Sequence, residues 1–171
     1  MMNLNNAVEK AKTSSFYRRM LNIALDRMIP FNKPHRFRIV EIGDDHITTS
    51  IPYVKRNLNH IRGLHACGLA TLSEFTTGFL LLSKLDSKKY RLIMQRLEMD
   101  YHYQGKTEGK ATFALTKEWL QKEIIAPLET QNSVVVVCEV KIHDQAENHL
   151  TTGKVHWQIK EWQKVRTKLR P

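Results

Sequence analysis

The longest apolar stretch of the chain runs from Gly63 to Ser83 and carries one formal charge, that of Glu74. Leu, Ala, Phe, Thr and Gly fill the rest, and the length predicts one helix over about 66–82. A helix that is apolar on nearly every side is buried. A carboxylate halfway along such a helix is costly unless something satisfies or uses it. Glu74 is therefore the first candidate functional residue.

The same stretch is long enough to suggest a membrane span. Its three glycines, its Ser and Thr residues, its His and its central Glu argue against one, so we expect no transmembrane segment. The first residues show no basic segment followed by an apolar one, which predicts no signal peptide and a cytoplasmic protein. Cys67 and Cys138 lie in apolar stretches, and we expect both to be small buried residues in a reducing compartment.

Alternation of apolar and polar residues predicts six strands, at 36–42, 47–54, 90–104, 108–116, 134–143 and 151–161. Turn signals such as Gly43-Asp44-Asp45 separate neighbouring strands, which indicates hairpins and an antiparallel sheet. A helical period predicts an N-terminal helix over 4–28, which the residues 13–15 could break into two. A short helix is expected near 117–127.

This order of elements predicts an α+β protein in which about six antiparallel strands curve around one long central helix. The 171 residues suit a single domain, with a helical extension at 1–30, a core at 36–161 and a basic tail at 162–171. The basic N-terminal helix could lie on a membrane surface. We favour the other interpretation, that it packs across the sheet or covers the mouth of a pocket.

The formal net charge of +10 fits either a solvated basic surface or attraction to an anionic ligand, such as nucleic acid or coenzyme A. Lys55, Arg56 and Arg62 precede the central helix and are candidate phosphate contacts, although ordinary loop charge explains them as well. No Cys/His cluster has zinc-ligand spacing, so no metal or other cofactor is expected. No nucleic-acid-binding motif stands out, so no nucleic-acid partner is expected.

Asn59, His65 six residues later and Glu74 nine residues after that form a spaced motif, with His60, Ala66 and Gly78 also in place. The motif and the strand order over 36–161 resemble the hotdog-fold acyl-CoA thioesterase superfamily, in its PaaI-like branch. Two departures stand out. Many such thioesterases read His-Gly-Gly where this chain reads His-Ala-Cys-Gly, and the usual loop glycine is Arg62 here, with Gly63 shifted by one.

The resemblance implies hydrolysis of an acyl-CoA or another acyl thioester at the subunit interface of a homodimer or a dimer of dimers. Glu74 would be the base or nucleophile. The implied catalytic residues are Glu74, His65 and Asn59, and the implied substrate-binding residues are His60, Arg62, Ala66, Cys67, Gly68, Thr77 and Gly78. The backbone amides of Ala66 and Cys67, at a helix N-terminus, would polarise the thioester oxygen.

Two alternatives remain open at this point. Glu74 could be a structural carboxylate satisfied by Ser and Thr hydroxyls inside the oligomer. The chain could also be a non-catalytic acyl-CoA or fatty-acyl binding protein with the same pocket, which the altered His-Ala-Cys-Gly segment favours. His65 and Glu74 are separated by about 12 Å of helical rise, so one subunit alone does not bring them together.

Overall fold

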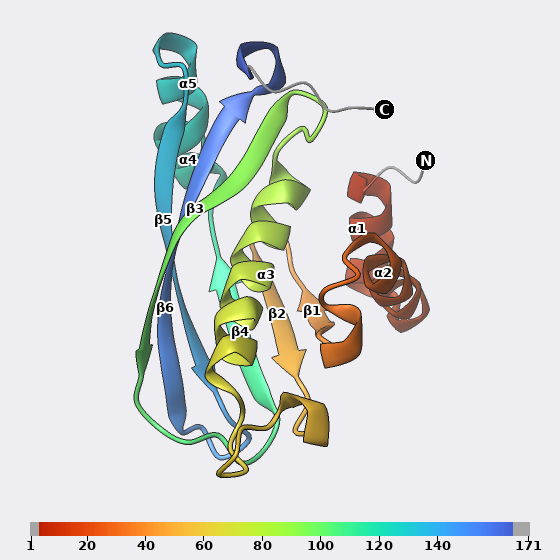
Figure 1. Cartoon of the computed structure of the whole chain (residues 1–171). Helices are drawn as coiled ribbons and strands as arrows, with labels where there is room; N and C mark the ends of the chain where they lie inside the picture. The colour runs from red at the N-terminus through yellow and green to blue at the C-terminus, as the bar shows by residue number, and fades with distance from the viewer. Residues whose placement is uncertain (1–3, 166–171) are drawn as a thin grey trace.

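The computed structural model describes residues 4–165, and within them six antiparallel strands form one sheet (Figure 1). The strand order is β1-β2-β4-β5-β6-β3. The strands are β1 (Arg38–Ile42), β2 (His46–Ile51), β3 (Tyr90–Tyr101), β4 (Gly109–Ala114), β5 (Val134–His143) and β6 (His149–Glu161). The predicted class, the number of strands and their antiparallel pairing are confirmed.

Several strands are shorter than the alternating pattern predicted. β2 ends at Ile51 because Pro52 follows it and has no N–H to donate. β1 begins at Arg38 rather than at 36, because the chain before it forms the 3₁₀ turn η1 (Lys33–His35). Arg36 then takes the left-handed conformation, with φ of 57°, and redirects the chain into the strand.

The central helix α3 (Ala66–Lys84) lies along one face of the sheet and contacts all strands but β1 with several residues (Figure 1). By length and composition it could span a membrane, but most of it is buried inside the fold. β5 shows the matching pattern on the sheet, since Val134, Val136 and Cys138 are buried and Val135 is exposed. The prediction that the sheet buries the apolar helix is confirmed.

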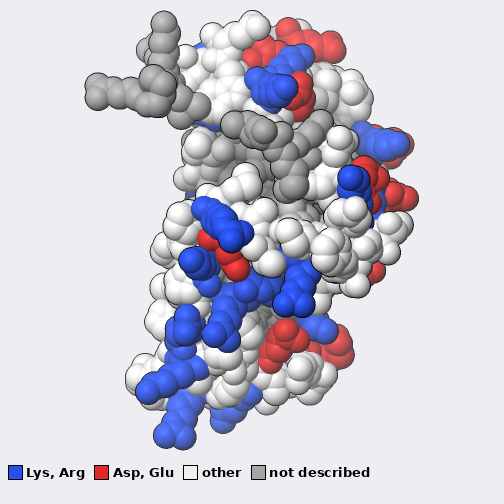
Figure 2. Space-filling view, turned by 90° about the vertical axis from the view of Figure 1, so that its right-hand side faces the viewer, with Lys and Arg blue, Asp and Glu red and all other residues white. Residues whose placement is uncertain are grey.

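The predicted N-terminal helix is two helices, α1 (Leu4–Thr13) and α2 (Ser15–Met28), which pack beside α3 and β1 (Figure 1). Ser14 separates them and caps α2, where its hydroxyl accepts the Tyr17 N–H at 3.5 Å. Leu21 and Leu25 are buried, so the favoured interpretation, packing onto the fold, is confirmed. Figure 2 faces this side and shows Lys and Arg side chains gathered from its centre to its lower left.

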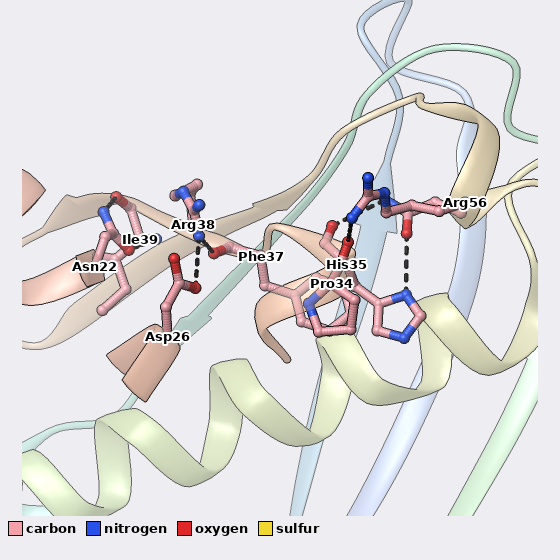
Figure 3. Close-up of polar contacts among 9 residues, drawn as sticks. Asn22, Asp26, Pro34, His35, Phe37, Arg38, Ile39 and Arg56 are labelled. Carbon is pink, nitrogen blue, oxygen red and sulfur yellow. Dashed lines mark hydrogen bonds and ion pairs between the residues drawn. The ribbon is translucent and has the colours of Figure 1, made fainter. Parts of the chain in front are cut away.

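The two edges of the sheet differ. On the β1 edge the side-chain amide of Asn22 accepts the Ile39 N–H at 2.8 Å and donates to the Ile39 carbonyl at 3.0 Å (Figure 3). On the other edge, β3 pairs only with β6 among the described residues, and Ile93 and Met94 are exposed there. β3 is therefore the edge on which another strand could pair.

The remaining elements are short. The segment after β4 forms α4 (Lys117–Leu120), the π turn η3 (Gln121–Ile125) and α5 (Ala126–Thr130). It extends past the predicted end because Pro127 lies in the first turn of α5, where proline is tolerated. η2 (Lys55–Asn57) precedes α3, and η4 (Trp162–Lys164) follows β6. The rest of the predicted basic tail, 166–171, lies outside the described residues, and the predicted domain boundaries stay a prediction.

Candidate functional site

Glu74 lies midway along α3 and is half-buried at a pocket of about 280 Å³ between α3, the N-terminal helices and the sheet. It is the one charged residue among the described residues that line this pocket. The other lining residues are Leu4, Leu25, Met28, Ile29, Phe75, Gly78, Phe79, Leu82, Leu92 and Trp157. A single carboxylate in an apolar pocket can act on a ligand whose body is apolar.

Burial raises the pKa of the Glu74 carboxyl above its ordinary value. Among the described residues no donor bonds that carboxylate, because the hydroxyls of its own helix are used elsewhere. Thr71, Ser73 and Thr76 each donate to a carbonyl one turn back in α3. Within one chain, Ser and Thr hydroxyls therefore do not satisfy Glu74, and the carboxylate is available to a ligand.

The wall beside Glu74 depends on a close approach of α3 to β6. A Cβ on Gly78 would lie 2.6 Å from Cζ2 of Trp157, so any larger residue would push the ring away. The Trp157 indole N–H donates to the Thr77 hydroxyl at 2.9 Å, and Thr77 donates on to the Ser73 carbonyl. Thr77, which the resemblance marks as a substrate contact, is fully buried within the single chain and orients Trp157; its contact with substrate stays a prediction.

A second hollow, of about 340 Å³, lies at the N-terminus of α3, and Asn59, Ala66 and Tyr101 line it. Glu74 does not line it. The predicted catalytic residues therefore fall at two separate places in one chain, as the helical rise between them requires.

His65 caps α3, and its Nδ1 accepts the Cys67 N–H at 3.1 Å. The neutral ring then carries its proton on Nε2. One of the two amides predicted to polarise a thioester oxygen is therefore already bonded inside the chain. The Ala66 N–H has no partner among the described residues, so it is the amide that a ligand oxygen can accept from.

Asn59 shapes the loop that leads into α3. Its side-chain oxygen accepts the N–H groups of Ile61 and Gly63, at 3.1 and 2.9 Å. Arg62, between them, has φ of 59°, the left-handed conformation that glycine adopts most readily. The departure noted in the sequence thus has a structural counterpart, since Arg62 takes that conformation and Gly63 does not.

The other predicted binding residues are distributed unevenly. His60 and Arg62 are exposed and line neither the Glu74 pocket nor the hollow at the start of α3, whereas Gly68 is buried, with a Cβ there 2.9 Å from Ile51. Gly68 therefore serves the packing of α3 on β2. Cys67 is exposed, which corrects the expectation that both cysteines are buried; Cys138 is buried as predicted. Cys67 lies in the first turn of α3.

Sequence reasoning missed Tyr101, whereas the N-terminal helix was already expected to pack across the sheet or to cover the mouth of a pocket. The Tyr101 hydroxyl donates to the Ala66 carbonyl at 3.1 Å, and burial raises the pKa of this phenol. The aromatic side chains at the end of the long strand were visible in the sequence. Only the pairing of β3 with β6 brings Tyr101 to the start of α3.

One antiparallel sheet around a single central helix defines this chain as a hotdog fold, and solved structures agree. It is similar to a Pseudomonas aeruginosa protein of unknown function called a probable thioesterase, with 19% identity, a TM-score of 0.76 and coverage of 84% of this chain and 95% of that one. A thioesterase from Haemophilus influenzae has 12% sequence identity and a TM-score of 0.66, and the match covers 86% of this chain and 93% of that one. A mutant of a Staphylococcus aureus thioesterase has 15% sequence identity and a TM-score of 0.62, and the match covers 77% of this chain and 98% of that one.

The family model described as a domain of unknown function, DUF4442, matches residues 18–159. The chain therefore belongs to this family. None of the curated proteins matches it. The similarity to thioesterases is thus one of fold.

Proposed function

We propose that this protein hydrolyses acyl thioesters, with acyl-CoA as the substrate and Glu74 as the catalytic carboxylate. The observation that carries the proposal is an unpartnered carboxylate on the wall of an otherwise apolar pocket. The acyl chain would occupy the pocket, and its thioester end would face Glu74. The residues of α1 and α2 that line the pocket would then limit the size of the acyl chain that fits.

The raised pKa of Glu74 suits either role that the reaction offers. A desolvated carboxylate is a stronger base toward water and a stronger nucleophile toward the thioester carbon. Attack places negative charge on the thioester oxygen. The free Ala66 N–H, at the positive end of the α3 dipole, would stabilise that charge. His65 and Asn59 would act by positioning this amide.

A homodimer would bring the two places together. Antiparallel pairing of β3 with its copy reverses the direction of α3, so the N-terminus of one helix would approach the middle of the other. Glu74 of one subunit and Ala66 of the other would then share a site. The free β3 edge, with half-buried Leu92, Leu97 and Met99 beside it, supports this arrangement.

The anionic end of coenzyme A would meet basic loops. Lys55, Arg56 and Arg62 are exposed near the start of α3, and Arg56 also donates to the Pro34 carbonyl at 3.0 Å (Figure 3). His60 and Cys67 lie in the same region and are the remaining candidate contacts.

Turnover of short, medium and long acyl-CoAs by the purified protein tests the proposal. Glu74→Gln should lower the rate about 10²- to 10⁴-fold, the range for loss of general base catalysis. Glu139→Gln, on the exposed face of β5, is the matched control and should not change it. Saturable acyl-CoA binding without turnover at any chain length would instead indicate the acyl-binding alternative.

The shared site can be tested separately. Ala66→Pro removes the proposed amide donor at the first helical position, where proline is tolerated. His65, at φ −69° and ψ 134°, already has the conformation that precedes proline. Each single variant should be inactive. A mixture of Glu74→Gln and Ala66→Pro subunits should recover activity in mixed dimers, because one of their two sites is intact. No recovery would contradict a site built by two subunits.

A further inference from the structure

The outer face of α2 and the turn after it expose apolar side chains that the fold does not need. Phe16, Met20 and Ile23 follow one another at helical spacing and are 65%, 49% and 37% exposed. Phe31, before η1, is 67% exposed. The opposite face of α2 already anchors the helix, so this stripe is free for a partner.

Basic side chains flank the stripe. Arg19, Arg27, Lys33 and Arg36 are exposed and form no ion pair among the described residues. Figure 2 looks onto this side, where Lys and Arg side chains gather near the centre. The surface therefore joins apolar groups to an excess of positive charge.

A groove of about 550 Å³ between α2 and β1 continues this surface. Arg18, Arg19 and Arg38 line it, and no acidic residue does. Arg38 is held by Asp26 at 3.0 Å (Figure 3), whereas Arg19 is open to solvent. Exposed Ile23 and Val40 form apolar parts of its wall. Guanidinium groups in such a hollow are suited to a phosphate group.

We propose that the α2–η1 surface, formed by these residues, docks onto an anionic membrane. A helix with an apolar stripe flanked by arginines binds in the headgroup region of a bilayer, where both kinds of group are satisfied. A nucleic acid would match the charge but would leave the apolar stripe in water. Met28, 69% exposed at the end of α2, also lines the Glu74 pocket, so the helix that carries the docking stripe also forms part of the proposed acyl site.

Vesicle co-sedimentation tests the proposal. The full chain should sediment with vesicles of phosphatidylcholine and phosphatidylglycerol, should remain in solution with phosphatidylcholine alone, and should be released by salt. Arg19→Gln combined with Arg27→Gln should weaken partitioning about fivefold per charge removed. Phe16→Ala combined with Met20→Ala should also weaken partitioning into the anionic vesicles at low salt, because the buried apolar area is lost while the positive charge is kept.

The matched controls lie on the far side of the sheet. Lys110→Gln with Lys154→Gln removes two exposed cations, and Val135→Ala with Val137→Ala trims two exposed apolar chains; both should bind as the parent does. All substituted side chains are exposed, and thermal unfolding checks that each variant folds. The proposal is overturned if anionic vesicles do not bind the parent, if the α2 variants bind as the controls do, or if RNA is bound and vesicles are not.

Discussion

Asn22 on α2 is bonded to Ile39 on β1 as a neighbouring strand would be, through both the N–H and the carbonyl of Ile39. One side-chain amide thus satisfies the outer backbone groups at this position of the edge strand. An open sheet edge is a template for pairing with another chain. The arrangement closes the β1 edge here and leaves β3 as the edge available for assembly.

Asn22→Asp should lower the free energy of unfolding by about 2 kcal/mol. The carboxylate still accepts the Ile39 N–H, but it cannot donate to the Ile39 carbonyl, and a buried group left unpaired costs about 1–3 kcal/mol. Urea unfolding measures the change. Asn132→Asp, at an exposed position, is the control and should alter stability little. Equal losses in both variants would point to the added charge rather than the lost bond.

Glu74→Gln should raise stability at neutral pH by about 1 kcal/mol, the usual scale when a functional group is replaced. The raised pKa means that the folded protein holds a proton that the unfolded chain has already released. Stability of the parent therefore falls as pH rises from about 4.5, the ordinary Glu value, through the folded pKa. The gain of the variant should shrink toward pH 4. A gain that does not change with pH would mean that Glu74 is not destabilised by burial.

The two cysteines should differ in reactivity. Cys67 is exposed at the start of α3, whereas burial raises the pKa of the Cys138 thiol to about 12. Because the thiolate is the reactive form, iodoacetamide should label Cys67 in the native protein and Cys138 only after unfolding. Peptide mass spectrometry reads this out. Labelled protein should also lose thioester hydrolysis, because the label on Cys67 blocks the N-terminus of α3. Cys67→Ala should hydrolyse thioesters and should keep that activity after iodoacetamide treatment.

Arg62→Gly should raise the free energy of unfolding by about 0.5–1 kcal/mol. Relief of about 1–2 kcal/mol of left-handed strain is partly offset by the greater freedom of glycine in the unfolded chain. Arg36→Gly, at φ of 57°, should behave in the same way. Lys55→Gly, outside the left-handed region, should lose stability instead. Thermal or urea unfolding measures the stability of the three variants. A change of stability in the same direction in all three would contradict the role of left-handed strain.

The sequence by itself determined the secondary elements and their class. The apolar run predicted α3 to within two residues at its end, and alternation located all six strands, because both patterns are local consequences of burial on one face or on all faces. The spaced Asn59, His65 and Glu74 motif pointed to the hotdog fold, which the structural comparisons confirm. It did not establish what each of these side chains contacts.

Only the tertiary structure decided those contacts. Every position on an apolar helix looks equally buried in the sequence, so exposed Cys67 and buried Thr77 could not be told apart there. The bonds from Asn22 to Ile39 and from Tyr101 to Ala66 join residues far apart in the chain, and no local pattern encodes them. The packing of α3 against the sheet and the N-terminal helices decides which side chains face a pocket, because exposure depends on what lies opposite each residue.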